Sequence, residues 1–383
     1  MAEYVYADQF FFASGVKGPG YLEICDGKFG EYVDQVTDSQ AIIHQYAGKW
    51  IAPGLVDTHI HGYANHDVMD NDAVGLKKMS EALLTCGVTS YLPTTLTASK
   101  EQLKAVAETI AMVQSEVTGA KIQGIYFEGP FFTEEHKGAQ NPHYFGDPDL
   151  ASFHEWQVAA KGLIKKIALA PERQGVSEFV RAVTAEGVVV ALGHSHATFA
   201  QAQTAVEAGA TVFVHAFNAM RGLNHREPGM VGALLGLQHV YSELICDGHH
   251  VHPEACGILI DKVGAEHVAL ITDCMMAGGM PDGSYQLGEF PVIVKAGAAR
   301  LQTGNLAGSI LTLKEAIKHV VDWNLATPAE AVMMASLVPA ISCHLDHTCG
   351  QIKAGRAADF IVLDSDMQLF ATYLDGKKRF ERE

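Results

Sequence analysis

Two histidines, His59 and His61, stand one residue apart at the end of the apolar stretch IAPGLVDTHIHG, residues 51–62. In an extended strand, side chains two residues apart point to the same side, so both imidazoles would face one way. Four further residues with metal-binding side chains each close an apolar, β-rich run: Glu128, His194, His215 and Asp273. Four imidazoles and two carboxylates are a ligand set for divalent transition metals. The six residues therefore predict a metal site, provided that the fold brings these run ends together.

Each of these residues taken alone also has a structural explanation. A single histidine at a strand end is more often a hydrogen-bonded structural residue than a ligand. Glu128 or Asp273 alone could cap a following helix, since each precedes a loop. The joint pattern of six residues favours the metal site.

The elements that must position these side chains are eight apolar, β-rich runs. They end near His61, Thr94, Glu128, Leu169, His194, His215, Asp247 and Asp273. Amphipathic stretches such as residues 73–87 and 177–187 lie between most of them, and many end in glycine, as helices commonly do. Near-continuous apolar strands alternating with helices indicate a parallel sheet buried on both faces. The α/β pattern predicts a TIM-like (β/α)8 barrel, whose active site lies at the C-terminal strand ends.

The two chain ends have a different pattern, with short alternating runs and turn signals. Residues 1–52 and 344–383 are each too short to hold a core, and we expect them to form one small β-sandwich domain beside a catalytic barrel of residues 53–343. A further β-like segment, residues 283–309, follows the eighth run and predicts a hairpin insertion on the catalytic face.

Charge and composition limit the partners. The chain of 383 residues has a formal net charge of −17, which argues against nucleic acid and anionic membranes. An anionic substrate would need a local cationic pocket. Seven cysteines without a CxxC pair, an acidic N-terminal segment and no apolar run of ~18 residues predict a reduced, cytoplasmic chain without a signal peptide or membrane span.

A family resemblance sharpens the metal prediction. PGLVDTHIHG, residues 53–62, resembles the first-strand motif of the amidohydrolase superfamily. Further motifs are similar to those of the N-acetylglucosamine-6-phosphate deacetylase family: IYFEGPFF, KGAQNP, LAPE, LGHSHAT, VHAFNAM, HREPG, ICDGHHVHP, LITDCM and GNLAGS. The match extends from about residue 50 to the C-terminus. Superfamily members that bridge two metals with a carboxylated lysine differ, because this family uses Glu128 of FEGP.

The resemblance implies a role for each predicted ligand. Glu128, His194 and His215 would bind a principal divalent metal. His59 and His61 would allow a second ion, so one or two are expected per subunit. Asp273 would stand among the metal ligands as the catalytic acid/base. Zinc is the first expectation, and iron, nickel, cobalt and manganese suit the same ligands.

The resemblance also implies a substrate site. Asn218, Ala219 and Arg226 would hold a phosphate, with Arg226 reaching across a homodimer interface; its structural alternative is a surface arginine paired with Glu227. The segment Asp247, Gly248, His249 and His250 would contact the sugar through His250, with His249 and His252 as supporting loop residues. The remaining implied contacts are Ala139 and Gln140, together with Leu306, Ala307 and Gly308 near the acetyl group. Some relatives have histidine in place of Gln140, whose amide can still donate a hydrogen bond.

The implied reaction is hydrolysis of the acetamide of N-acetylglucosamine 6-phosphate to glucosamine 6-phosphate and acetate, in amino-sugar catabolism. A metal would polarise the carbonyl and activate water. Asp273 would carry a proton from that water to the sugar nitrogen, and Gln140 or His250 would stabilise the oxyanion.

Three alternatives compete with this reaction. N-acetylgalactosamine 6-phosphate differs only at the C4 hydroxyl. A cyclic-amide hydrolase such as a dihydroorotase lacks support, because the bridging lysine is missing while HREPG and FNAM are present. A non-catalytic scaffold on the same fold would typically have lost metal ligands, and all six remain.

Overall fold

A parallel barrel forms the centre of the molecule, in a computed structural model that describes residues 3–383. Its strands pair in chain order: β6 (Leu55–Ile60), β9 (Val88–Thr95), β11 (Ile125–Phe131), β12 (Ile164–Leu169), β13 (Val189–Leu192), β14 (Val212–Phe213), β15 (Tyr241–Leu244) and β16 (Val268–Leu270). The first and last strands meet just beyond β16, where the backbone N–H of Asp273 donates to the carbonyl of His59 at 2.9 Å. The predicted eight-stranded barrel is confirmed.

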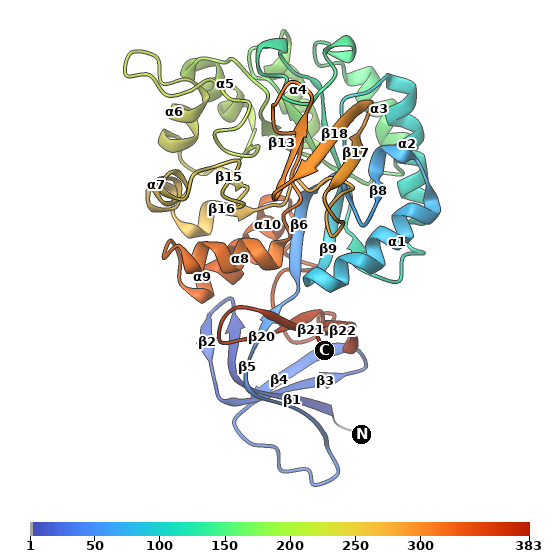
Figure 1. Ribbon diagram of the computed structural model, residues 1–383, viewed down its shortest axis with the longest axis vertical. Helices are drawn as coiled ribbons and strands as arrows, with labels where there is room; N and C mark the ends of the chain where they lie inside the picture. Colours follow the sequence, from blue (N-terminus) through green and yellow to red (C-terminus); the bar gives the residue numbers. More distant parts are fainter. Residues whose placement is uncertain (1–2) are drawn as a thin grey trace.

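Helices surround the barrel (Figure 1). They are α1 (Ala73–Leu83), α2 (Lys100–Val113), α3 (Leu150–Ala159), α4 (Val176–Ala185), α5 (Phe199–Ala208), α6 (Gly229–Gly236), α7 (Pro253–Val263), α8 (Leu313–Asp322), α9 (Pro328–Met334) and α10 (Leu337–Ser342). Polar caps begin several of them: the side chain of Ser99 accepts from the N–H of Gln102, and Thr198 accepts from Gln201. With helices outside and side chains filling the inside, every residue of β6, β9 and β11 is buried.

Three predicted strand ends are displaced. The strands β13, β14 and β16 end before His194, His215 and Asp273, which the sequence pattern had placed at the strand ends. These three residues have φ values of +46°, +29° and +49°. A left-handed backbone cannot continue a β-strand, so the strands stop and the site residues lie in the first turns beyond them. Such backbone conformations are costly for residues with a side chain and often cluster at functional sites.

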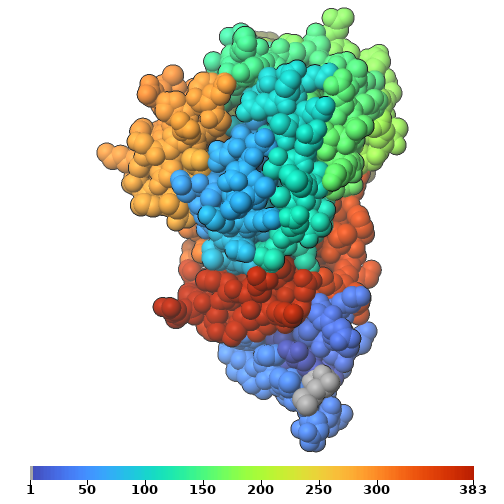
Figure 2. Space-filling model, turned by 90° about the vertical axis from the view of Figure 1, so that its right-hand side faces the viewer, coloured from blue at the N-terminus to red at the C-terminus, as the bar shows by residue number. Residues whose placement is uncertain are grey.

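A second sheet joins the two ends of the chain. It comprises β1 (Glu3–Phe12), β2 (Gly15–Lys17), β3 (Gly20–Cys25), β4 (Lys28–Val33), β5 (Ile42–Pro53), β20 (Phe360–Asp364), β21 (Leu369–Leu374) and β22 (Lys377–Glu381). Strand β5 pairs in parallel with β1 and antiparallel with β20, so both ends share one hydrogen-bonded sheet with its own apolar core. In Figure 2 the C-terminal strands lie between the barrel and the N-terminal strands. The domain division after residues 52 and 343 stays a prediction.

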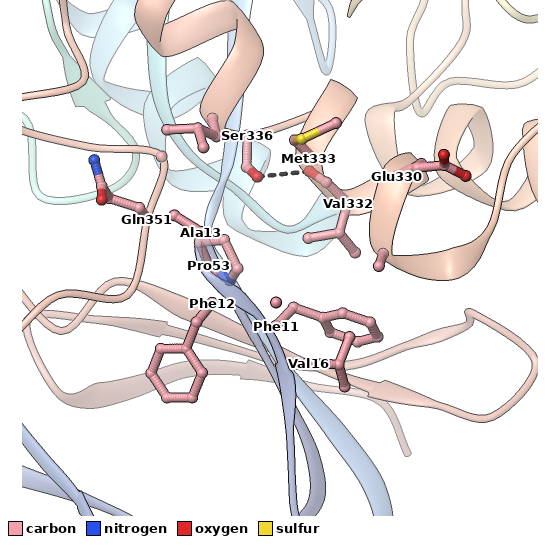
Figure 3. A pocket seen from close by; sticks show the side chains of 14 residues that line it. Phe11, Phe12, Ala13, Val16, Pro53, Glu330, Val332, Met333, Ser336 and Gln351 are labelled. Atoms are coloured by element: carbon pink, nitrogen blue, oxygen red, sulfur yellow. Dashed lines mark hydrogen bonds between the residues drawn. The ribbon is translucent and has the colours of Figure 1, made fainter. Parts of the chain in front are cut away.

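An apolar pocket lies where the small sheet meets the barrel (Figure 3). Phe11 and Val16 face Val332 and Met333 of α9 across it, and Pro53, the last residue of β5, lies two residues before the start of β6. The pocket is therefore far along β6 from the strand end that carries His59. Its lining residues pack the two parts of the chain together.

The predicted insertion after β16 is confirmed, with one strand more than a hairpin. Strands β17 (Gly283–Leu287), β18 (Phe290–Lys295) and β19 (Ala298–Leu301) form an antiparallel sheet of three. In Figure 1 it occupies the upper part of the molecule, while the small sheet lies at the bottom.

Short elements complete the fold: β7 (Gly62–Tyr63), β8 (His66–Asp67), β10 (Lys121–Ile122) and the 3₁₀ turns η1 (Val68–Asp70), η2 (Leu84–Cys86), η3 (Glu134–His136), η4 (Pro142–Tyr144) and η5 (Ala265–His267). Among residues 3–383, no helix is long and apolar enough to cross a membrane.

Candidate metal centre and active site

A cavity opens at the C-terminal ends of the barrel strands. Of the residues singled out from the sequence, it is lined by His61, Glu128, Ala139, Gln140, His194, His215, Asn218, Ala219, His250, Asp273, Leu306 and Gly308. His59 and Ala307 lie behind this lining, with both side chains 0% exposed. The structure thus gathers residues from distant parts of the chain into one place.

Three of the four predicted histidine ligands are oriented by backbone carbonyls. In each, Nδ1 lies within hydrogen-bond distance of an oxygen: Thr94 O for His61 (3.2 Å), His136 O for His194 (3.0 Å) and Asn218 O for His215 (3.2 Å). A carbonyl oxygen only accepts, so Nδ1 carries the proton. In the neutral imidazole, Nε2 then keeps the lone pair that a metal needs.

His194, His215 and Glu128 form the first donor group. Their three donor atoms lie at almost equal distances from one another. Oε1 of Glu128 lies 3.3 Å from Nε2 of His194 and 3.2 Å from Nε2 of His215, and the two nitrogens are 3.0 Å apart. Two ring nitrogens with lone pairs repel at this distance unless a cation lies near both. Nitrogen and carboxylate donors with such separations fit a divalent ion.

His59, His61 and Glu128 form a second donor group. Nε2 of His59 lies 3.4 Å from Oε1 of Glu128, and Nε2 of His61 lies 3.2 Å from Oε2. Glu128 therefore belongs to both groups. Nε2 of His59 is buried without a hydrogen-bond partner, which is unfavourable for a polar atom. Burial opposes protonation of His59, but Glu128, Glu243 and Asp273 raise its pKa to about 9. The surplus negative charge that attracts this proton would also attract a metal cation, so the donor set fits one or two divalent ions.

Asp273 stands beside both histidines of the HxH pair. Its Oδ1 lies 3.0 Å from Nε2 of His61 and 3.4 Å from Nε2 of His59. Burial alone would raise the pKa of Asp273, but these histidines hold it below its usual value. The carboxyl group is therefore ionised and can accept a proton in the cavity.

Gln140 holds Glu128 in place. Its Nε2 donates to Oε2 of Glu128 at 2.7 Å, and its Oε1 accepts from the N–H of Thr97 at 2.8 Å. One N–H of the amide remains for another acceptor. A role of Gln140 at the substrate carbonyl stays a prediction, and the structure adds a role in orienting the shared carboxylate.

Asp247 orients His250 towards its place in the cavity wall. Oδ2 of Asp247 is 2.6 Å from Nδ1 of His250, and Oδ1 accepts from the N–H groups of His249 and His250 at 2.8 Å. Burial opposes ionisation of Asp247, but His250 lowers its pKa. Gly248 and His249 are exposed and do not line the cavity.

Arg226 does not line the cavity of its own chain. It is exposed on the loop of residues 221–228, and its Nη1 lies 2.9 Å from Nε2 of His225. Glu227 instead accepts from the backbone of Phe199 and Gly229, and residues 3–383 contain no Arg226–Glu227 salt bridge. The structural alternative of a pair with Glu227 therefore has no support.

Known proteins share this architecture. The model of the Amidohydrolase family matches residues 50–380. This chain belongs to the amidohydrolase family. Curated amidohydrolase relatives include the N-acetylglucosamine-6-phosphate deacetylase of Vibrio furnissii, 40% identical over 332 residues, which are 86% of this chain and 83% of the relative. The N-acetylgalactosamine-6-phosphate deacetylase of Escherichia coli O157:H7 is 40% identical over 357 residues, 93% of each chain.

A solved structure extends the similarity to three dimensions. The chain resembles an Asp-to-Ala mutant of N-acetyl-D-glucosamine-6-phosphate deacetylase from Mycobacterium smegmatis, in complex with N-acetyl-D-glucosamine-6-phosphate. The TM-score is 0.93 at 32% identity, with 99% of each chain covered. The amidohydrolase fold predicted from the motifs thus holds over nearly the whole chain.

Two buried charged residues near the metal donors were missed. Lys166 of β12 and Glu243 of β15 form an ion pair inside the barrel, and Oε2 of Glu243 lies 3.0 Å from Nδ1 of His59. Burial opposes ionisation of Glu243, but Lys166 and His59 lower its pKa to about 2. The available signal was a charged residue within an apolar run, the second lysine of IKKIAL and the glutamate of ELICD.

Proposed function

We propose that this amidohydrolase removes the acetyl group from N-acetylglucosamine 6-phosphate, giving glucosamine 6-phosphate and acetate, as part of amino-sugar catabolism. The observation that carries the proposal is the convergence of four imidazoles, Glu128 and Asp273 at one cavity. The names of the relatives supply the substrate class: phosphorylated N-acetyl amino sugars.

Each donor group would hold one divalent ion. Glu128, His194 and His215 would bind the principal ion, and His59 and His61 would share Glu128 with a second. When bound, the metal supplies a Lewis acid for the amide carbonyl and lowers the pKa of water. Zinc is preferred because imidazole and carboxylate donors suit it, while iron, nickel, cobalt and manganese remain alternatives.

Asp273 would move the proton that the reaction needs. Water adds its oxygen to the acetyl carbon, and Asp273 accepts a proton from that water. The same carboxylic acid then donates the proton to the sugar nitrogen as the C–N bond breaks, so that an amine leaves instead of an amide anion. His250, held by Asp247, would contact the sugar or the oxyanion, and Leu306, Ala307 and Gly308 would enclose the acetyl group.

Phosphate recognition would need a second subunit. Asn218 and Ala219 lie in the cavity, but neither supplies positive charge. A dianionic substrate of a chain with net charge −17 needs a cation, and Arg226 is exposed outside its own cavity. We therefore propose a homodimer in which Arg226 of each subunit completes the phosphate site of the other.

The galactosamine epimer is the second candidate. The glucosamine and galactosamine relatives are equally similar, each 40% identical. We prefer the glucosamine substrate because the solved neighbour at a TM-score of 0.93 is a glucosamine enzyme.

One experiment tests the function and its alternatives. Acetate release should be measured with both epimeric 6-phosphates, ring opening should be followed separately with dihydroorotate, and metal content should be determined on the same sample. We expect acetate from at least one phosphate, loss of turnover after chelation and recovery with a divalent ion. A metal-replete protein that releases no acetate would support the scaffold alternative, and full activity after complete demetallation would contradict the metal assignment.

A further inference from the structure

A buried ion pair lies behind the HxH pair, inside the barrel. Lys166 and Glu243 are 0% and 1% exposed, and the ammonium contacts Oε1 of the carboxylate. The same ammonium lies 3.5 Å from the carbonyl oxygen of Thr58 and 3.9 Å from the ring centre of Tyr126. Burying two charges is costly, and such a pair is often no more stabilising than apolar residues of the same size. A role beyond stability is therefore worth seeking.

The second carboxylate oxygen of Glu243 is directed at His59. Oε2 lies 3.0 Å from Nδ1 of His59 and also accepts from the backbone N–H of His215 at 3.4 Å. Each of the other three histidines has a neutral carbonyl at Nδ1. His59 is thus the one predicted ligand whose Nδ1–H is held by a charged acceptor. A carboxylate in this position fixes the ring and makes the opposite nitrogen a stronger ligand.

The ammonium of Lys166 offsets the buried negative charge of Glu243. Three carboxylates, those of Glu128, Glu243 and Asp273, lie within 3.4 Å of the ring nitrogens of His59. The ammonium of Lys166 compensates Glu243 from the side away from His59, because it contacts the other carboxylate oxygen. Glu128 and Asp273 lie next to Nε2 of His59, where a cation would be held, and among the described residues only histidines pair with them.

From this geometry we infer that Glu243, compensated by Lys166, is a positioning residue that orients His59 for a second divalent ion bound with His61 and Glu128. The inference rests on the proposed function, because it concerns the second ion of the same site. The inference separates the two donor groups, because Nδ1 of His194 and of His215 is held by a carbonyl and Glu243 contacts His215 through its backbone N–H alone. Loss of the pair should therefore weaken the second ion and spare the principal one.

The test is zinc binding by the full chain with both charges removed. The double variant Lys166→Met/Glu243→Gln leaves no orphaned charge. Zinc content should be measured after equilibrium dialysis against buffers of defined free zinc. We expect two ions in the wild type, and in the variant an unchanged first ion with a second bound about 10–100-fold more weakly.

A second ion pair elsewhere provides the control. Lys121 and Asp359 contact each other at 2.8 Å, Lys121 also contacts the exposed Asp375 at 2.6 Å, and none of the three lines the cavity. The variant Lys121→Met/Asp359→Asn should lower the unfolding temperature without changing either zinc affinity. If the Glu243 double variant does not fold, Glu243→Asp keeps both charges and shortens the side chain, and it should weaken only the second ion.

Three outcomes would overturn the inference. They are unchanged affinity for the second ion, equal weakening of both ions, and a wild type that binds one ion at saturating zinc. The proposed function is judged separately by acetate release from the wild type. A two-zinc protein without deacetylase activity would reject the function, while the zinc-binding comparison would still test the role of Glu243.

Discussion

Asp273 is where the proton chemistry of the proposed reaction is concentrated. Its carboxylate lies 3.0 Å from Nε2 of His61 in the cavity wall, and its lowered pKa keeps it ready to accept a proton. Asp273→Asn preserves size and hydrogen bonding but cannot carry the proton. We expect kcat to fall by ~10²–10⁴-fold, the usual contribution of general acid–base catalysis. Acetate release and metal content should be measured together. A variant with full metal and near-normal kcat would move the proton role to another residue, His250 being next.

The two donor groups can be ranked by one substitution made in each. His194 belongs to the principal group and His59 to the second. If one ion suffices for catalysis, His59→Asn should retain much more activity than His194→Asn, and only His194→Asn should lose the tightly bound ion. Activity and zinc content of the two variants form a matched comparison. Equal losses of activity would show that both ions are required.

At the scale of elements, strand ends and loops bring the site together. The eight apolar runs were predictable from sequence because parallel barrel strands are buried on both faces. The exact ends at His194, His215 and Asp273 were not, because a left-handed φ leaves no periodic signal. Lys166 and Glu243 were missed for a related reason. A charge in an apolar run gives no sign of its partner, and the pairing exists only after β12 and β15 face one another across the barrel.

The insertion of β17–β19 is coupled to the loop that follows β11. Glu289, in the turn between β17 and β18, accepts hydrogen bonds from Asn141 at 2.5 Å and from the hydroxyl of Tyr144 at 3.2 Å. Asn141 directly follows Gln140, which contacts Glu128. This contact joins two walls of the cavity.

Glu289→Ala should loosen that contact. Exposed polar pairs contribute about 0.2–1 kcal/mol, so we expect KM to rise up to about fivefold while kcat and metal content change little. Steady-state kinetics would show the split. Glu155→Ala, which removes an exposed pair between Glu155 of α3 and Lys100 of α2, is the control and should leave KM unchanged. A fall in kcat alone for Glu289→Ala would contradict a role in enclosing the substrate.

At the scale of the whole molecule, the cation that the phosphate site needs lies outside the cavity of its own chain. Motif resemblance placed Arg226 in the phosphate site, and the structure places it on an exposed loop outside the cavity. No feature of a single sequence states which copy of the chain an arginine will serve. A closed twofold dimer would resolve the disagreement, since each subunit then gives its loop to the other and both sites are completed alike.

Arg226→Ala tests this arrangement. Removing one partner of a buried charge pair costs ~2–5 kcal/mol, or roughly 30-fold to several thousand-fold in affinity. We expect KM for the phosphorylated sugar to rise at least tens of fold, because the guanidinium can bind two phosphate oxygens at once. The weak turnover of unphosphorylated N-acetylglucosamine should hardly change. Equal losses on both substrates would exclude the phosphate role.

Mixing two inactive variants then decides whether the site is shared. In a mixed dimer of Arg226→Ala with Asp273→Asn, one cavity combines an intact Asp273 with an intact Arg226 from the other subunit, and the second cavity carries both defects. Random reassociation of equal amounts makes half of the dimers mixed, so up to about a quarter of all sites should regain wild-type kinetics. Subunit exchange can be verified by native mass spectrometry of tagged chains. With exchange verified, no recovery would mean that Arg226 serves its own subunit or none, whereas recovery of low KM and high kcat together requires a cavity built from two chains.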